Sequence, residues 1–188
     1  METPRPGPSE LEAFQALYER HFDFVWRTLR HLGVREADLS DACQEVFIIV
    51  HRRLPSFEER AKVTTWLFRI CANMARDRRR LAHVRSEVLG DEAIDDAVRR
   101  RDPTTELERQ DKLAAFEGAL KSMSFDQRAA FILFEIEGLT GPEAAAALEV
   151  PLPTAYSRLR LARQAFLSAV QQARSEAPQR KARRGGTG

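Results

Sequence analysis

The chain has 188 residues, a formal net charge of +2, 43% hydrophobic residues and 31% charged residues. This composition is typical of a globular protein with enough apolar residues to bury a core, and the length fits one mid-sized domain or two small ones. The longest apolar runs, VFIIV at 46–50 and AAFILF at 129–134, are far too short to span a membrane, and the start METPRPGPSE predicts no signal peptide.

The two cysteines, Cys43 and Cys71, lie in helical apolar patterns. We therefore expect two buried thiols in a reduced, cytosolic protein. The sequence contains no Cys-x-x-Cys, and its four histidines show no ligand-type pairing. We expect neither a metal nor a cofactor.

The charge is sorted into blocks along the chain. Residues 64–85 carry a net charge of +5, residues 86–111 carry −5, and residues 174–188 carry +4. Charge blocks of this kind suggest interaction partners.

The hydrophobic pattern follows the 3.6-residue period of a helix, and no segment has a convincing strand pattern. The predicted fold is therefore all-α, with two helical domains joined by a flexible acidic linker. The first domain covers 10–85, the linker 86–104 and the second domain 105–173. A basic tail at 174–188 is expected to be disordered. It either adds nonspecific DNA affinity or serves as a solubilising or regulatory tail.

In the first domain, a helix over about 10–32 has a core stripe that begins at Leu11, and a second helix runs from about Glu36 to Arg53. One face of the second helix combines acidic and amide side chains with one aliphatic side chain, which is unusual. Its residues are Asp38, Asp41, Gln44, Glu45 and Ile48. Plain solvated surface explains the acids. An exposed Ile favours a docking face for a basic protein.

The next helix contains the stretch TTWLFRICANMARDRRR at 64–80. Helical geometry places its polar and aromatic residues on one narrow face: Thr65, Trp66, Arg69, Asn73, Arg76 and Arg80. Leu67, Ile70 and Leu81 are expected on the opposite, packed face. A solvated basic face is the alternative, but Asp77 is its only acid. Spaced arginines with an aromatic ring and an amide favour nucleic acid, with arginine on phosphate, the ring on an unpaired base and Asn on a base edge.

In the second domain, Ser124 with Gln127 and Thr140 with Glu143 have the spacing of capping boxes. The segment 140–163, TGPEAAAALEVPLPTAYSRLRLAR, predicts a supporting helix, a short turn at Glu149 and a basic second helix. This pattern indicates a helix-turn-helix whose second helix enters the major groove, although an ordinary helical hairpin is the alternative. The residues expected together on its outward face are Tyr156, Ser157, Arg160, Arg163 and Gln164. Thr154 and Arg158 are further candidate DNA-binding residues of the same helix.

These segments, in this order, resemble a bacterial RNA polymerase sigma factor of the extracytoplasmic-function (ECF) group over about 12–170. FQALYERHFDFVWRTL resembles the opening of region 2, DLSDACQEVFIIVHRRLPSF its polymerase-docking helix, and TTWLFRICANMARDRRR its −10 helix. SFDQRAAFILFEIEGLTGPEAAAALEVPLPTAYSRLRLAR resembles region 4.

The resemblance implies a protein that is not an enzyme. It binds core RNA polymerase and directs initiation at promoters with particular −10 and −35 elements. Asp38, Asp41, Gln44 and Glu45 would dock on the coiled coil of the largest subunit. Trp66, Arg69, Asn73 and Arg76 would engage the −10 element, with a flipped base held by the loop at about 57–65. Tyr156, Ser157, Arg158 and Arg160 would read the −35 element, with Arg163 on phosphate.

The resemblance also implies further partners. Region 4 would sit on the polymerase flap, and the acidic linker would thread toward the RNA exit path. An anti-sigma factor that clamps both regions is expected, because the family often works that way.

The chain departs from the family pattern near the predicted turn. A basic residue is common where Tyr156 stands, an Arg where Leu161 stands, a Gly where Glu149 stands and a capping Ser where Pro151 stands. These departures leave the −35 preference and the shape of the turn open.

Three rival functions remain: a stand-alone helix-turn-helix regulator that does not engage polymerase, a small enzyme, and a protein that sequesters a partner without reading DNA. The first leaves the Asp38–Glu45 face unexplained. The second lacks a nucleophile with a base, a phosphate loop and metal ligands.

Overall fold

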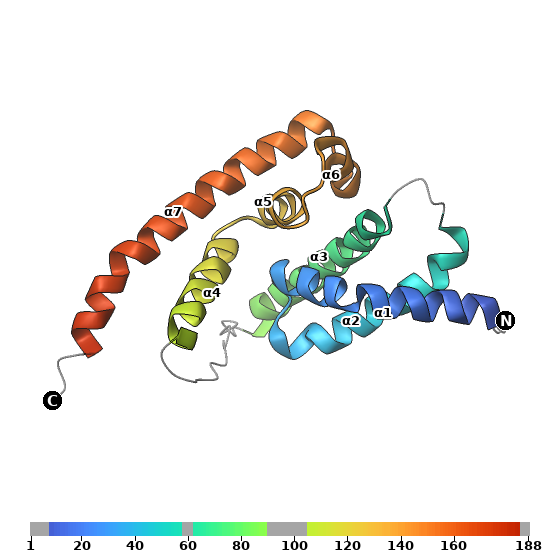
Figure 1. The fold of residues 1–188 in the computed structure, drawn as a ribbon, viewed down its shortest axis with the longest axis horizontal. Helices are drawn as coiled ribbons and strands as arrows, with labels where there is room; N and C mark the ends of the chain where they lie inside the picture. Colours follow the sequence, from blue (N-terminus) through green and yellow to red (C-terminus); the bar gives the residue numbers. More distant parts are fainter. Residues whose placement is uncertain (1–7, 58–61, 90–104, 185–188) are drawn as a thin grey trace. The chain divides into compact units, whose positions relative to one another are not determined.

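Figure 1 shows the computed structural model of the chain, in which residues 8–57, 62–89 and 105–184 are described. The chain forms two compact units, divided between Asp95 and Asp96. Helices, turns and loops account for all described residues, and no strand occurs among them. The prediction of two all-α domains is confirmed.

The first unit is a three-helix bundle of α1 (Pro8–His31), α2 (Leu39–Arg53) and α3 (Val63–Leu89). Each of the three helices packs against the other two. The completely buried side chains come from all three: Val25 and Leu29 from α1, Leu39, Val46 and Val50 from α2, and Leu67 and Phe68 from α3. The apolar spacing in the sequence predicts Val25, Leu29, Val46, Val50 and Leu67 at buried positions, but it does not single out Leu39 or Phe68.

Short turns connect these helices. Gly33 ends α1 with a φ of 93°, and the amide of Val34 donates to the carbonyl of Leu29, so a glycine closes this helix end. The expected helix start at Glu36 is a 3-10 turn, Glu36–Asp38, and the α-helix begins at Leu39. A second 3-10 turn, Leu54–Ser56, follows α2.

The second unit contains α4 (Thr105–Lys121), α5 (Phe125–Phe131), α6 (Gly141–Leu148) and α7 (Leu152–Arg184). A π-helical turn, Ile132–Ile136, continues α5. The long helix α7 packs against α4, α5 and α6 (Figure 1). A cluster of Leu120, Met123, Phe131 and Ala162 forms part of its core, with Phe116 and Phe166 packed against it.

Both predicted capping boxes are present. The amide of Gln127 donates to the Ser124 hydroxyl, and the amide of Ser124 donates to the Gln127 side chain. Thr140 and Glu143 make the equivalent pair at the start of α6. Each box satisfies backbone amides that the first helical turn leaves without partners, which fixes where α5 and α6 begin.

Two expected boundaries differ from the structure. Helix α3 continues to Leu89, so residues 86–89 are helical, and the remaining linker residues, 90–104, lie outside the described residues. The tail was expected to be disordered from 174, but α7 continues to Arg184. Residues 174–184 contain no glycine, but they include Pro178, which cannot donate a backbone hydrogen bond and disfavours a helix interior. The helix therefore continues past a residue that usually kinks or ends one.

Candidate functional sites on three exposed helix faces

The first site is the outward face of α2. Asp41, Gln44 and Glu45 are exposed, and Ile48 retains 43% of its surface exposed among them. Val46 and Val50 on the opposite side are completely buried. The helix therefore holds an aliphatic side chain in solvent within a polar, acidic face, as the sequence predicts.

Two acids of this face bind arginines of their own unit. Asp38 is half-buried at the start of α2, where its Oδ2 accepts a hydrogen bond from Arg35 Nε at 2.7 Å. Glu45 Oε1 accepts from Arg78 Nη2 of α3, also at 2.7 Å. Sequence reasoning missed Arg78 because it lies 33 positions from Glu45 and only the bundle brings the two together.

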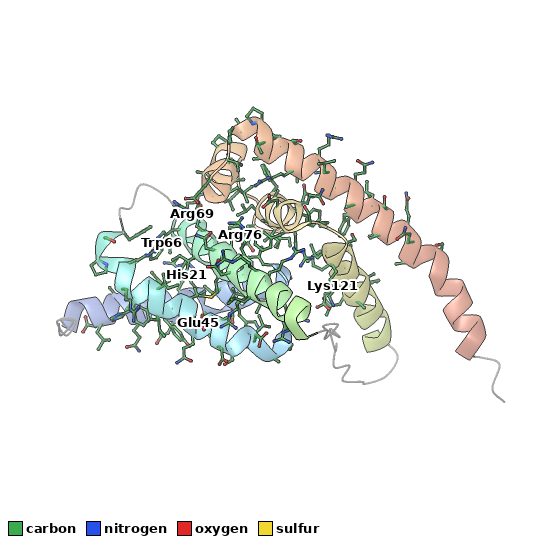
Figure 2. All side chains as sticks on the ribbon, turned by 180° about the vertical axis from the view of Figure 1, so that it is seen from behind. His21, Glu45, Trp66, Arg69, Arg76 and Lys121 are labelled. Atoms are coloured by element: carbon green, nitrogen blue, oxygen red, sulfur yellow. The ribbon has the colours of Figure 1, made fainter. Side chains whose placement is uncertain are left out.

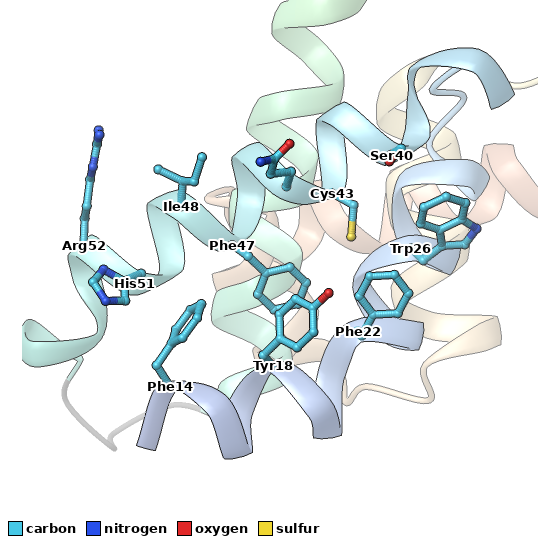
Figure 3. A pocket seen from close by; sticks show the side chains of 11 residues that line it. Phe14, Tyr18, Phe22, Trp26, Ser40, Cys43, Phe47, Ile48, His51 and Arg52 are labelled. Atoms are coloured by element: carbon cyan, nitrogen blue, oxygen red, sulfur yellow. The ribbon is translucent and has the colours of Figure 1, made fainter. Parts of the chain in front are cut away.

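An aromatic groove of about 660 Å³ lies between α1 and α2, beside the same face. Figure 3 shows Phe14, Tyr18, Phe22 and Trp26 of α1 directed toward α2, and Ile48 at the rim. The rings of Tyr18 and Phe47 are in contact, with centroids 4.6 Å apart and planes tilted by 59°. The apolar spacing that begins at Leu11 predicts that Phe14, Tyr18 and Phe22 belong to the core, but Tyr18 is 39% exposed and Leu11 is 54% exposed. Part of the expected stripe therefore lines a groove.

The second site is the outward face of α3 (Figure 2). Arg69, Asn73, Arg76 and Arg80 are exposed, as predicted. Arg76 Nη1 donates to Asn73 Oδ1 at 3.4 Å. Trp66 is half-buried, and its ring lies 4.7 Å from that of Phe57 at 37°. Along this face the Trp66 ring, which packs on Phe57, is followed by Arg69, Arg76 and Arg80.

Two predictions for α3 are wrong. Thr65 was expected on the exposed face, but only 5% of it is exposed because the first turn of α3 packs against the bundle. Leu81 was expected to pack, but it is 64% exposed. Helix α3 leaves the core after Ala75, since the residues from Arg76 to Leu81 are all exposed or half-buried.

The two cysteines are free and buried, as expected. Burial raises the pKa of the Cys43 thiol to about 11. Burial, and secondarily the neighbouring Cys43, raises the pKa of Cys71 still further. Both side chains therefore stay protonated near neutral pH and act as small apolar groups. Within the described ranges, no cluster of metal-ligating side chains and no helix able to span a membrane is present.

The third site is the helix pair α6–α7. Between them Glu149 adopts the left-handed conformation with a φ of 56°, where the family pattern has glycine. Ala144, Ala147, Ala155 and Ala162 are buried, and these small residues let the helices approach closely. The predicted helix-turn-helix geometry is confirmed.

Tyr156 bridges α7 to the rest of this unit. Its ring centroid lies 5.6 Å from that of Phe134, and its hydroxyl lies against Gly141 at the start of α6. Gly141 is buried, and a Cβ there would lie 2.7 Å from the Tyr156 ring carbon that bears the hydroxyl. Tyr156 is nevertheless 50% exposed, so it both packs and faces solvent.

Two predicted DNA-binding arginines of α7 bind carboxylates of their own unit. Arg158 Nη2 lies 2.8 Å from Asp126 Oδ2, with 24% of the Arg158 side chain exposed. Arg163 Nη2 lies 2.6 Å from Glu135 Oε1. Ser157 and Arg160 are exposed, and Thr154 is half-buried. The six predicted residues therefore all lie in the N-terminal half of α7, but they differ in exposure and in whether a carboxylate binds them.

Arg128 is a further structural residue that the sequence did not single out. It is only 9% exposed and donates to the backbone carbonyls of Lys121 and Met123. Buried arginines need such acceptors. This one joins the end of α4 to α5 and so supports the platform on which α7 lies.

Comparison with known proteins identifies both units. The Sigma-70 region 2 model matches residues 17–83, and the Sigma-70 region 4 model matches residues 113–166. The chain is 32% identical over 170 residues to the RNA polymerase sigma factor NccH of Alcaligenes xylosoxydans xylosoxydans, covering 89% of this chain and 91% of that protein. It is 30% identical over 175 residues to the ECF RNA polymerase sigma-E factor of Escherichia coli K12, with 89% and 91% covered.

A solved structure of CnrH in complex with the cytosolic domain of CnrY is similar to this chain. The TM-score is 0.64 and the identity 26%, with 86% of this chain and 90% of that one covered.

Region 2 followed by region 4 defines a sigma factor of the sigma-70 class. The chain belongs to the extracytoplasmic-function group of this family, whose members bind core RNA polymerase and direct promoter-specific initiation of transcription. The rival interpretation, a stand-alone helix-turn-helix regulator, is not favoured because it leaves region 2 unexplained.

Proposed function

We propose that the exposed face of α2 docks on the coiled coil of the largest polymerase subunit. One observation carries this assignment: Ile48 stays 43% exposed within an acidic face. An apolar side chain gains from being covered, and acids around it select a basic partner. Asp41, Gln44 and Glu45 are the proposed polar contacts, with Asp38 at the edge of the face.

We assign recognition and opening of the −10 element to the exposed face of α3. Arg69, Arg76 and Arg80 supply positive charge for phosphates, and Asn73 can hydrogen-bond a base edge. Trp66 offers a ring for stacking, supported from behind by Phe57. Thr65 is omitted from this surface because its side chain is buried. Of the loop proposed to hold a flipped base, residues 58–61 lie outside the described residues.

We assign recognition of the −35 element to the N-terminal half of α7, placed in the major groove by α6. Ser157 and Arg160 face solvent and are the direct candidates. Tyr156 faces the same side but is held against Phe134. Thr154 lies at the edge. Arg158 and Arg163 would reach phosphate only by exchanging a carboxylate for it.

The chain is proposed to act in the cytoplasm as a specificity subunit rather than as an enzyme. It is also proposed to bind an anti-sigma factor. The similar CnrH structure holds a protein domain, the cytosolic domain of CnrY, which supports a protein partner for this chain as well. A partner that covers the α3 and α7 faces would block both DNA contacts.

Charge reversal on α2 tests the docking assignment. The double variant Asp41→Arg, Glu45→Arg should weaken binding to purified core polymerase at least about tenfold, because two attractive contacts become repulsive. Binding is measured by fluorescence anisotropy of labelled protein, and folding by circular dichroism. Asp23→Arg, an exposed acid on α1, is the matched control and should bind normally. Unchanged affinity of a folded double variant would sink the assignment.

A further inference from the structure

Fewer side chains project outward from α7 than the sequence predicts. Counting about 100° per residue, Ser157, Leu161 and Gln164 lie within about 60° of one another, with Arg160 beside them. All four are exposed. Ala155, Leu159 and Ala162 occupy the opposite, buried side.

Contacts within the unit border this outward stripe on both edges. On one edge Arg158 binds Asp126 at 2.8 Å. On the other, Arg163 binds Glu135 at 2.6 Å, and the ring of Tyr156 lies on Phe134. The side chains at both edges are therefore held toward the helical body, and the stripe of Ser157, Arg160, Leu161 and Gln164 projects between them.

Leu161 is the apolar member of the stripe, and 38% of its surface is exposed. Its three companions carry hydrogen-bonding groups, whereas leucine carries none. On base edges in the major groove, the prominent apolar group is the C5-methyl of thymine. An exposed leucine on a recognition helix therefore suits the thymine methyl better than the polar edges of the other bases.

We propose that Leu161 is a specificity-determining residue that contacts a thymine methyl in the −35 element, with Ser157, Gln164 and Arg160 making polar contacts on one side of it. The proposal rests on the assigned role of α7 in reading that element. Burying a methyl against leucine adds affinity only where the base is thymine, and this DNA contact is the proposed reason for an exposed leucine on this face.

Replacing thymine by deoxyuridine tests the contact, because this removes the methyl and leaves pairing unchanged. The −35 element is first selected from random upstream DNA with holoenzyme reconstituted from full-length protein. Each thymine on either strand is then replaced in turn. At one position, wild-type binding should weaken roughly three- to fivefold, the value expected for one buried methyl.

The variant Leu161→Ala should lose a similar factor on thymine DNA and show no further loss with deoxyuridine. Leu167→Ala is the matched control, since Leu167 is also an exposed leucine of α7, at 60%, but lies about 120° around the helix. It should keep the full deoxyuridine effect.

Three results would overturn the proposal: no position is sensitive to deoxyuridine, the sensitivity persists in Leu161→Ala, or Leu161→Ala weakens polymerase binding in the absence of DNA. The last would assign Leu161 to the polymerase. A wild-type holoenzyme with no −35 preference at all is a separate result, which would refute the assigned role of α7 itself.

Discussion

The arginine side chains near the candidate sites differ in the contacts that they make. Arg78, Arg158 and Arg163 bind carboxylates of their own unit, and of these Arg163 is also exposed. Arg69, Arg76 and Arg160 lie on the exposed faces of α3 and α7. An exposed ion pair contributes at most about 1 kcal/mol, so the paired arginines can be recruited by DNA but start with a competitor. Arg76 lies on the α3 face to which recognition of the −10 element is assigned, and it is the arginine chosen for mutation.

Charge reversal at Arg76 tests the α3 face. Arg76→Glu should weaken binding of the holoenzyme to −10 DNA by about tenfold or more and reduce its salt dependence, because a phosphate contact becomes repulsive. Opening is followed by the fluorescence of 2-aminopurine placed in the −10 element. Arg53→Glu, an exposed arginine at the end of α2, is the matched control. Equal losses in both variants would indicate a general charge effect and contradict the assignment.

The backbone at Glu149 is strained, as the sequence indicates by placing Glu where the family pattern has glycine. Its left-handed φ of 56° costs a non-glycine residue about 1 kcal/mol. Glu149→Gly should therefore raise the free energy of unfolding by about 1 kcal/mol, measured by urea denaturation followed by circular dichroism. A lower stability than the wild type would show that the Glu149 side chain contributes more than its backbone conformation costs.

Helix packing at the element scale depends on one glycine. Gly141 begins α6, and the Tyr156 hydroxyl occupies the space where a Cβ would lie. Gly141→Ala should lower the free energy of unfolding by about 1 kcal/mol or more, since the ring must move and the α6–α7 contact opens. The same urea experiment measures it.

Gly118→Ala, in the last turn of α4, is its control. A Cβ there would meet no atom within 4 Å, so this variant should gain about 0.5–1 kcal/mol from helix propensity. A stable Gly141→Ala with unchanged tyrosine fluorescence would contradict the proposed packing.

The elements themselves could be predicted because their signals are local. Capping boxes at Ser124 and Thr140, the glycine after α1 and the 3.6-residue apolar period depend on neighbours within one or two turns. The ends of α3 and α7 were not predicted, although glycine follows each of them in the sequence: α3 ends at Leu89, before Gly90, and α7 ends at Arg184, before Gly185. The burial of Thr65 depends on how its helix packs against the bundle. A helical wheel gives the angular position of a residue but not the neighbours that cover it.

The candidate sites were predictable to a similar extent. Exposure of Ile48, Arg69, Asn73 and Arg160 follows from helical phase alone. The partners of Glu45, Arg158 and Arg163 lie 28 to 33 positions away, and no local pattern links them. The same limit applies to the α1–α2 groove, where aromatic residues with core spacing line a hollow.

At the scale of the whole molecule, two units carry three exposed faces with different chemistry. An acidic face with one aliphatic residue suits a protein, and two faces with arginines suit DNA. Separate units for the two DNA faces fit a protein that recognises two promoter elements. This division of labour is the central claim of the account, and it requires the full chain together with polymerase.

Run-off transcription tests it most directly. Purified bacterial core polymerase is supplied with a pool of random upstream sequences, with and without the full-length protein. We predict discrete transcripts only when the protein is present, from templates that share two upstream elements. The result that would contradict the account is a protein that binds core polymerase and DNA separately yet yields no transcript dependent on it from any template.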